Sequence, residues 1–488
     1  MPQPSGSEAR WKPSRYLTRV ELPRQRVLLL FGGIGSRLIE VPAKRAADLD
    51  RLLAHPSAAE TDGRPALQVL LREQGLLVPE SFDEVACLER LYRRARTGPA
   101  RHLGLTICPT LGCNFRCSYC YQHHGSGSMA EAVQDRLVDF VRDRITPATT
   151  LSVVWYGGEP LLARRVIERL SSAFMSPDLE KAGYDASIVT NGSMLTPAAS
   201  RLLTDLEVRE AQVTLDGPRE VHDRRRPLQG GHPTFDRILA NISRADPRLR
   251  ITIRVNVDRE NATAIPALLA QLDAAGLKGR AGVYFAAVRP YTEVCADVAE
   301  RCMQAPYWPR LQSQLQLMAQ QRGYGGLSLP ASITHHCMAD GDTGWLIDPD
   351  GLVFKCWNEV SEPHNAVFDL AAGQQTPKMQ EVAARWRAWN AFGLTECTQC
   401  AVLPLCLGGC PSLGMKLGQP HARGSCMEVR DNLRERIAIY YLGLKRREAA
   451  QQLHDAVAAW IPEVERIQST SGQLRQRGVR ADRPELAR

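Results

Sequence analysis

The feature that most constrains this chain is a run of three closely spaced cysteines, Cys113-x₃-Cys117-x₂-Cys120, which directly follows an apolar segment at residues 103–110. Thiolates this close in sequence can bind a single small inorganic centre. They are one ligand short of a closed four-thiolate site. A [4Fe–4S] cluster held by these cysteines would therefore keep one iron open for a further ligand.

This run resembles the cluster motif of the radical S-adenosylmethionine (radical SAM) enzymes, including the aromatic residue, Tyr119, before the last cysteine. The resemblance implies that the open iron chelates the amino and carboxylate groups of SAM. One electron from the cluster would then break a carbon–sulfur bond and yield a 5′-deoxyadenosyl radical, which makes Cys113, Cys117 and Cys120 both metal ligands and catalytic residues. The alternative interpretation is a partial zinc knuckle or a set of buried thiols.

Length, charge and cysteine content limit the remaining possibilities. A chain of 488 residues is longer than one core usually holds, so two or three domains are expected. The net charge of +8 is spread too widely to indicate a nucleic-acid partner. Neither a signal peptide nor a segment long enough to span a bilayer is found, which predicts a cytoplasmic protein without a membrane partner. Fourteen cysteines in a reducing compartment favour metal or redox sites over disulfides.

After residue 101, apolar runs alternate with amphipathic segments, which predicts parallel strands joined by helices and function at the carboxyl ends of the strands. Six such units fit the open barrel of the radical SAM proteins, so the expected fold class is α/β with a partial (β/α)₆ barrel. The expected strands are 103–110, 151–156, 186–190, 210–215, 250–257 and 282–288. The expected helices are 130–145, 161–174, 197–205, 234–245 and 264–275.

Several predicted strands end in residues with recognisable chemistry. Gly157-Gly158-Glu159-Pro160 follows the second strand, where glycines let the backbone approach a ligand and proline fixes the turn. By resemblance this segment binds the SAM amino group, although alone it could be a plain turn. Asn191, Thr214 and Asp216 lie at the ends of the next strands and could bind ribose or substrate, with Asp216 as a catalytic candidate, or simply cap the chain. The passage from Asp216 to Phe235 resembles the sulfatase-maturase and peptide-maturase branch.

A charged residue, Arg254, interrupts the apolar strand expected at 250–257. A buried arginine needs a carboxylate partner. The SAM carboxylate or an internal acid such as Glu159 would provide one, so Arg254 is counted among the cofactor-binding candidates.

Seven further cysteines lie in the C-terminal half, and their order and spacing resemble the SPASM domain, the auxiliary-cluster extension of radical SAM enzymes that act on peptides and proteins. Asp348-Pro-Asp-Gly351 predicts a tight turn with Gly351 at positive φ, between hairpin strands that carry Cys356. The resemblance implies two further [4Fe–4S] clusters. The outer set of ligands is Cys397, Cys400, Cys406 and Cys426, and the inner set is Cys337, Cys356 and Cys410.

The fourth inner ligand stays open at this point. Cys302 or Cys295 could reach in, His335 or His336 could substitute, or the iron could be left open for substrate. The competing interpretation of this region is structural zinc, because C-x₂-C pairs also build zinc ribbons.

The expected domains are a disordered N-terminus at 1–20, a small α+β module similar to a winged helix at 21–100, the barrel at 101–325, the SPASM domain at 326–430, and C-terminal helices with a basic tail at 431–488. The N-terminal module would grip the leader of a precursor peptide as an added strand, or act as a structural cap on the barrel.

The combined resemblance implies a radical SAM peptide maturase with SAM and three [4Fe–4S] clusters. It would abstract hydrogen from a ribosomally made precursor peptide and install an oxidative modification such as a thioether or carbon–carbon crosslink. A reducing donor such as flavodoxin or ferredoxin would supply electrons. The alternatives are an anaerobic sulfatase-maturase-type formylglycine-generating enzyme and a zinc-ribbon interaction protein.

Overall fold

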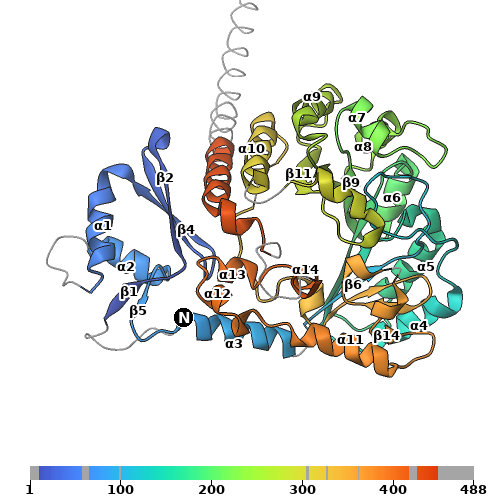
Figure 1. The fold of residues 1–488 in the computed structure, drawn as a ribbon, viewed down its shortest axis with the longest axis horizontal. Coiled ribbons are helices and arrows are strands. Elements are labelled where there is room, and N and C mark those ends of the chain that lie inside the picture. Colours follow the sequence, from blue (N-terminus) through green and yellow to red (C-terminus); the bar gives the residue numbers. More distant parts are fainter. Residues whose placement is uncertain are drawn as a thin grey trace, which may run out of the picture.

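The computed structural model describes residues 10–57, 65–97, 101–303, 307–325, 328–360, 362–416 and 426–448. Figure 1 shows a small N-terminal module at one end of the molecule and a sheet wrapped by helices at the other. The cysteine-rich C-terminal segments and the last described helix lie between them. The expected basic tail falls outside the described residues.

Six consecutive parallel strands form the centre of the largest sheet. They pair in chain order, each in parallel register with the next. The strands are β6 (His102–Ile107), β7 (Thr150–Trp155), β8 (Gly183–Thr190), β9 (Val208–Thr214), β10 (Arg250–Val257) and β11 (Ala281–Ala287). All six expected strands are present, and the expected α/β class with a partial barrel is confirmed.

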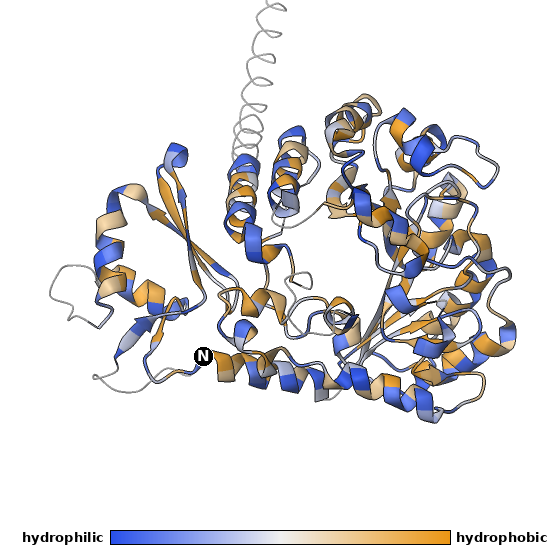
Figure 2. Cartoon of the chain, viewed as in Figure 1, coloured by the Kyte–Doolittle hydropathy of each residue, from blue (hydrophilic) through white to orange (hydrophobic). Residues whose placement is uncertain are grey.

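Helices cover the outside of this sheet, because each presents an apolar stripe to the strands. Figure 2 shows hydrophobic residues concentrated on the strands and mixed with hydrophilic ones on the helices. The helix expected at 161–174 begins instead with a 3₁₀ turn, η4 (Pro160–Ala163), and α7 was not predicted. The helices are α4 (Glu131–Arg142), α5 (Arg164–Met175), α6 (Pro197–Asp205), α7 (Arg219–Arg225), α8 (Phe235–Arg244), α9 (Ile265–Ala274) and α10 (Tyr307–Arg322).

The C-terminal part extends the same sheet beyond its first strand. β12 (Gly344–Ile347) runs parallel to β6, and β13 (Leu352–Phe354) and β14 (Phe368–Asp369) follow in antiparallel order. The hairpin expected before Cys356 is therefore present, with Gly351 at φ +86° in its turn. Because β13 runs back along β12, Cys356 follows beside the sheet, and the indole N–H of the next residue, Trp357, donates to Thr106 Oγ1 of β6 (3.0 Å).

Short turns and helices make up most of the remaining C-terminal part. They are η6 (Glu293–Arg301), η7 (Met338–Asp340), η8 (Trp357–Glu359), η9 (Pro363–Asn365), α11 (Pro377–Ala388), η10 (Ala391–Gly393), α12 (Thr395–Thr398), α13 (Leu403–Cys406) and α14 (Pro411–Lys416). A helix then includes residues 429–448. Among the helices of the described segments, none is long and apolar enough to cross a bilayer.

The N-terminal module contains a three-stranded antiparallel sheet in the order β2-β3-β4 and a two-stranded sheet of β1 and β5. The expectation of disorder up to residue 20 is wrong for the described part, since β1 and β2 occupy much of it. The elements are β1 (Trp11–Pro13), β2 (Leu17–Leu22), η1 (Pro23–Gln25), β3 (Val27–Gly32), β4 (Arg37–Pro42), η2 (Ala43–Arg45), α1 (Ala46–Ala54), α2 (Pro65–Glu73), β5 (Leu77–Pro79) and α3 (Glu84–Thr97).

This module packs on the C-terminal part of the chain. Side chains of β2 and β3 share an apolar cluster with Cys406 and with the helix that includes residues 429–448. From α3, Tyr92 donates a hydrogen bond to buried Asp340 (2.8 Å). The N-terminal module is thus joined to the cysteine-rich region by both apolar and polar contacts.

Candidate functional site

A cavity of about 350 Å³ opens at the carboxyl ends of the parallel strands. Three parts of the chain build its wall. The loop after β6 contributes the three cysteines of the motif, the later strand ends contribute polar groups, and the C-terminal part closes one side. The residues that line the cavity include Cys113, Cys117, Tyr119, Cys120, Tyr121, Tyr156, Gly157, Gly158, Asn191, Thr214, Arg226, Arg254, Asn256, Arg289, Tyr291, Trp357 and Cys410.

The loop that carries Cys113, Cys117 and Cys120, called here the cysteine triad, is held by a neighbouring segment. Phe115 forms an antiparallel bridge with Leu228. The backbone N–H of Ser118 donates to the carbonyl of Arg225 at 3.0 Å. The position of the triad is therefore set by backbone contacts to the end of α7 and the chain that follows it.

The cysteine triad is largely buried and lies beside a cationic side chain, Arg226. Burial raises the pKa of Cys113 to about 11 and that of Cys117 to about 12, while Arg226 acts in the opposite direction on both. Burial also acts to raise the pKa of Cys120. The hydrogen bond with His124 (3.6 Å) and one from a backbone N–H outweigh this effect, so that the pKa of Cys120 is lowered. Cysteine thiols such as these three, which line one cavity, are the ligand type that holds an iron–sulfur cluster.

Two glycines after β7 pack directly on the triad loop. A Cβ atom on Gly157 would lie 2.3 Å from the carbonyl oxygen of Thr110, and one on Gly158 would lie 2.2 Å from that of Gly112. Gly157 also has φ +116°. No larger residue can replace either without moving the backbone, which leaves peptide groups exposed to the cavity.

Glu159 and Pro160 are both buried and are not among the residues that line the cavity. Glu159 accepts hydrogen bonds from Thr190 Oγ1 (2.8 and 2.9 Å) and the backbone N–H groups of Asn191 (2.7 Å) and Leu161 (3.1 Å). Burial raises the pKa of Glu159 against the effect of these bonds. Glu159 thus joins the ends of β7 and β8. Of the four residues expected to bind the SAM amino group, Gly157 and Gly158 line the cavity, and Glu159 and Pro160 do not.

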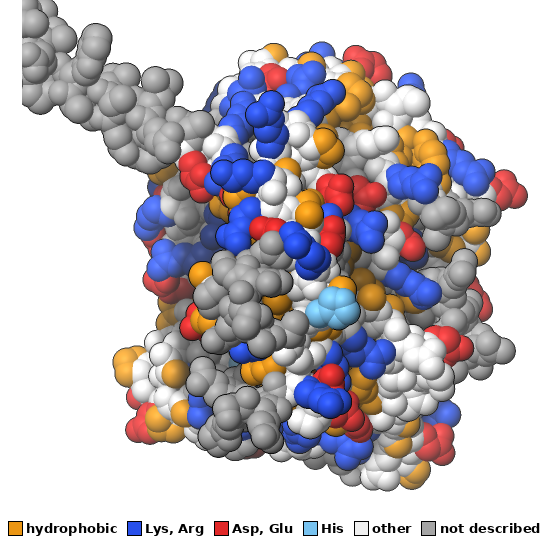
Figure 3. Space-filling view, turned by 90° about the vertical axis from the view of Figure 1, so that its left-hand side faces the viewer, with side chains coloured by type: hydrophobic (Ala, Val, Ile, Leu, Met, Phe, Trp, Pro, Cys, Tyr) orange, Lys and Arg blue, Asp and Glu red, His pale blue; other side chains and the backbone are white. Residues whose placement is uncertain are grey.

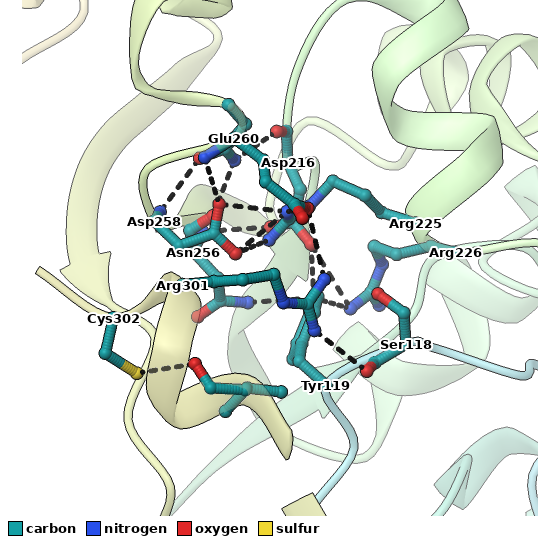
Figure 4. A network of polar contacts seen from close by, with 12 residues as sticks. Ser118, Tyr119, Asp216, Arg225, Arg226, Asn256, Asp258, Glu260, Arg301 and Cys302 are labelled. Carbon is teal, nitrogen blue, oxygen red and sulfur yellow. Dashed lines mark hydrogen bonds and ion pairs between the residues drawn. The ribbon is translucent and has the colours of Figure 1, made fainter.

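Asp216 is likewise fully buried, behind Tyr119. Figure 4 shows the network that surrounds it. Tyr119 Oη donates to Asp216 and accepts from Arg226 (2.5 Å) and Asn256 Nδ2 (3.0 Å), and the backbone N–H of Asn256 donates to Asp216 (2.9 Å). Asp216 therefore positions cavity-lining side chains and does not itself line the cavity, in contrast to the catalytic role expected from the sequence.

Next to this network, Arg225 forms a buried ion pair with Asp258 through both of its Nη atoms (2.9 Å each to Oδ2). The side chains of Arg225 and Asp258 are 6% and 0% exposed. Because the carbonyl of Arg225 also holds Ser118, this pair supports the triad loop.

Asn191 and Thr214 both line the cavity, as expected from their places at strand ends. Asn191 Nδ2 donates to Asn114 Oδ1 (2.8 Å), which lies within the cysteine motif itself. Arg254 also lines the cavity, but Glu159 is not its partner. Its contacts are with Asn256 Oδ1 (2.8 Å) and Tyr284 Oη (3.2 Å).

Sequence reasoning missed an aromatic wall and one arginine. Tyr121 and Tyr156 share a short hydrogen bond, and the ring of Tyr156 lies 4.3 Å from that of Trp357. The missed arginine is Arg226, which lines the same cavity. Tyr121 and Trp357 directly follow the cysteines 120 and 356, and this adjacency was the only available indication in the sequence.

Seven of the remaining cysteines fall into two sets according to the neighbours that act on their pKa values. Burial raises the pKa of Cys397 to about 12, with Cys406, Cys400 and Cys426 acting in the same direction. Burial raises the pKa of Cys337 to about 11, with Cys410 acting in the same direction. Burial also raises the pKa of Cys356, and Cys337 and Cys410 act in the same direction. These neighbours agree with the outer and inner sets that the resemblance implies, and their role as cluster ligands stays a prediction. Within the described ranges, no three His, Cys, Asp or Glu side chains are arranged around one metal-ion position.

The candidates for a fourth inner ligand lie in different places. Cys295 is buried in an apolar cluster with Val288 and Val298, against which Cys302 packs. The Cys302 thiol donates to the carbonyl of Val298 at 3.2 Å. His336 Nδ1 lies 3.0 Å from the carbonyl oxygen of Cys406. Each of these side chains already has local contacts.

Part of this chain is similar in sequence to proteins of known family. Residues 107–272 match the model of the radical SAM superfamily. Over 330 residues, 62% of this chain and 77% of the relative, the sequence is 24% identical to the serine-type anaerobic sulfatase-maturating enzyme of Klebsiella aerogenes. Over 170 residues, 31% of this chain and 35% of the relative, it is 31% identical to the radical SAM cyclopropyl synthase TigE of Paramaledivibacter caminithermalis.

Among solved structures, native anSMEcpe with bound AdoMet and Kp18Cys peptide is similar in fold, with a TM-score of 0.54. The sequences are 19% identical, and the match covers 71% of this chain and 98% of that one. The likeness concerns the fold, and it extends beyond the barrel.

Proposed function

We propose that this chain, whose residues 107–272 match the radical SAM superfamily, is a maturase with three iron–sulfur clusters that installs an oxidative crosslink in a ribosomally made peptide. One observation carries the proposal. The cavity that contains the cysteine triad is closed on another side by Trp357 and by Cys410 of the inner set. A substrate in this cavity would therefore contact both the barrel and the cysteine-rich part.

The triad would hold the SAM-binding [4Fe–4S] cluster, which supplies one-electron cleavage of SAM and a carbon-centred radical when both are bound. The side chains and peptide groups of this chain would bind SAM and orient it. The exposed peptide groups of Gly157 and Gly158 would bind the SAM amino group, and Asn191 and Thr214 would contact the ribose. Arg226, which lies beside all three thiols, would bind the SAM carboxylate.

The outer set, Cys397, Cys400, Cys406 and Cys426, and the inner set, Cys337, Cys356 and Cys410, would each hold an auxiliary cluster. Their separate grouping supports this assignment. The aromatic side chains of Tyr121, Tyr156 and Trp357 would exclude water from the space between the triad and the inner set.

The N-terminal module would bind the leader of the precursor peptide. Its three-stranded sheet has two outer strands, β2 and β4, to which an extended peptide could add. Figure 3 shows numerous Lys and Arg side chains on the face that includes this end of the molecule. Arg24, Arg26 and Lys44 are exposed near one end of the sheet, which suits a leader rich in acidic residues.

The similarity to sulfatase-maturating enzymes supports a second candidate, oxidation of a cysteine or serine to formylglycine. The two products differ chemically. A crosslink removes two hydrogen atoms without creating an aldehyde, whereas formylglycine reacts with hydrazide reagents.

The test is anaerobic reconstitution followed by iron and sulfide analysis, SAM-cleavage assays, and mass spectrometry of co-expressed candidate peptides. Iron for three clusters, reductant-dependent 5′-deoxyadenosine and a hydrazide-inert product would support the proposal. A hydrazide-reactive product would replace it with the formylglycine activity. Stoichiometric zinc with negligible iron and no SAM cleavage would contradict both.

A further inference from the structure

The cavity wall carries positive charge that its own residues do not fully balance. Three arginines line it, whereas no aspartate or glutamate occurs among its described lining residues. Arg226 has an ion pair with buried Asp216 (3.9 Å), and Arg289 has one with Glu428 (2.9 Å). The third, Arg254, differs from both.

Within the described part of the chain, Arg254 has no carboxylate at ion-pair distance. Its Nε donates to Asn256 Oδ1 (2.8 Å) and its Nη1 to Tyr284 Oη (3.2 Å), and its guanidinium lies 5.8 Å from the centre of the Tyr284 ring. All of these partners are neutral. A guanidinium removed from bulk water in this way gains most from an anionic ligand.

The position of Arg254 separates it from the amino-acid end of SAM. Arg226 lies against the loop of the cysteine triad, where its Nη1 donates to the phenolic oxygen of Tyr119 (2.5 Å). Arg254 lies instead on β10, in register with Tyr284 of β11, and lines the same cavity as Tyr121, Tyr156 and Tyr291. The cysteine triad therefore has its own arginine, and Arg254 serves the aromatic side of the cavity.

That aromatic side faces the inner cysteine set. Tyr156 stacks on Trp357, the residue after Cys356, and the ring of Tyr121 lies 5.8 Å from that of Tyr291. Cys410 lines the same cavity. Arg254 thus lies in the space where a substrate would be held between the triad and the C-terminal part.

We infer that Arg254 binds a carboxylate of the substrate, either an Asp or Glu side chain close to the modified residue or the carboxyl terminus of the peptide. This inference rests on the proposed function and adds to it the chemical class of the substrate segment. An arginine can engage a carboxylate through two parallel N–H···O bonds, which also fixes the orientation of the bound group. A substrate anchored here would present its neighbouring carbon to the centre of the cavity.

The experiment measures retention of peptides on immobilised, reconstituted enzyme with SAM and without reductant, so that no turnover occurs. Three synthetic libraries are compared by mass spectrometry. One has a fixed central Asp or Glu and an amidated end, one has Asn or Gln at the same position and an amidated end, and one lacks acidic residues but has a free carboxyl terminus. The variants are Arg254→Gln and Arg254→Lys. Arg250→Gln is the matched control, since Arg250 lies on the same strand, is exposed and pairs with Glu210 (2.7 Å).

The wild type and the Arg250→Gln control should retain one of the two carboxylate libraries about tenfold or more above the amide library. Which library is retained identifies the side chain or the terminus as the source of the carboxylate. Arg254→Gln should lose the preference, and Arg254→Lys should recover part of it.

Equal retention of all libraries by the wild type, or a preference that persists in Arg254→Gln, would overturn the inference. So would a loss of SAM binding in Arg254→Gln, measured by equilibrium dialysis, because it would assign the residue to the cofactor. SAM cleavage by the same reduced preparations reports separately on the proposed function. An enzyme that cleaves SAM without acid preference contradicts only the role of Arg254.

Discussion

Two buried glutamates, one on each side of the cavity, are held in different ways. Glu159, in the barrel, is fully buried and both of its carboxylate oxygens accept hydrogen bonds, from Thr190, Leu161 and Asn191. Glu359, in the C-terminal part, is 5% exposed. Its Oε1 accepts from Arg385 (3.3 Å), but Oε2 has no hydrogen-bond partner within the described residues.

The difference reflects the secondary structure around each residue. The ends of parallel strands place backbone N–H groups and a threonine hydroxyl side by side around Glu159. Glu359 lies in the short turn η8, in a region of turns and brief helices. Such segments supply fewer internal partners, so we expect the barrel to hold its site without metal and the cysteine-rich part to depend on bound clusters for its structure.

The strongest test of this contrast compares two sets of cysteines. Cys397→Ala/Cys400→Ala should lower the melting temperature by on the order of 10 °C, because the outer set is held by turns that metal binding would stabilise. Replacing the triad with alanines should abolish SAM cleavage and change the melting temperature far less. Calorimetry and 5′-deoxyadenosine assays on reconstituted proteins measure both effects. Equal losses of stability in the two variants would contradict the comparison.

A second test concerns the buried pair that supports the triad loop. Asp258→Asn leaves the buried Arg225 guanidinium with the more distant and exposed Glu260 (3.5 Å) as its remaining ion-pair partner and should lower the free energy of unfolding by about 3–5 kcal/mol. Asp236→Asn, which breaks the exposed pair with Arg219, should cause little change. Denaturant unfolding measures the difference. If Asp258→Asn were as mild as its control, the network in Figure 4 would not be what holds the loop.

The smallest expected effect is a pH dependence. Burial raises the pKa of Glu359 to about 7, so the folded state binds a proton more tightly than the unfolded state. The stabilising contribution of protonated Glu359 to the free energy of unfolding is present at low pH and is lost as the pH rises through about 7. Relative to Glu359→Gln, the wild type should lose about 1–3 kcal/mol between about pH 5 and pH 8. Thermal melts across this range measure the slope.

Glu159→Gln provides the comparison for that slope. The pKa of Glu159 is raised by burial, but its hydrogen bonds oppose the shift. We therefore expect the Glu159→Gln difference to depend less on pH. A steeper slope for Glu159 than for Glu359 would reverse the contrast between the two regions.

Much of the fold was predictable because its cause is local. The alternation of apolar runs and amphipathic segments predicted six strands that the structure contains, and the DPDG turn predicted positive φ at Gly351. Gly157 and Gly158 were predictable as sites of close backbone approach. Asp216 was misassigned because its polar character at a strand end does not reveal that Tyr119 stands between it and the cavity.

The sequence by itself determined the cysteine motif, its place after the first strand of an α/β barrel, and the likeness to the radical SAM superfamily, because these depend on residue type and spacing along the chain. Only the tertiary structure decided which side chains meet. Glu159 turned inward, Arg226 lies by the triad, and Arg254 faces an aromatic wall formed with Trp357, more than a hundred residues away in sequence. Such contacts depend on sheet register and on the return of the C-terminal chain, which no local pattern encodes.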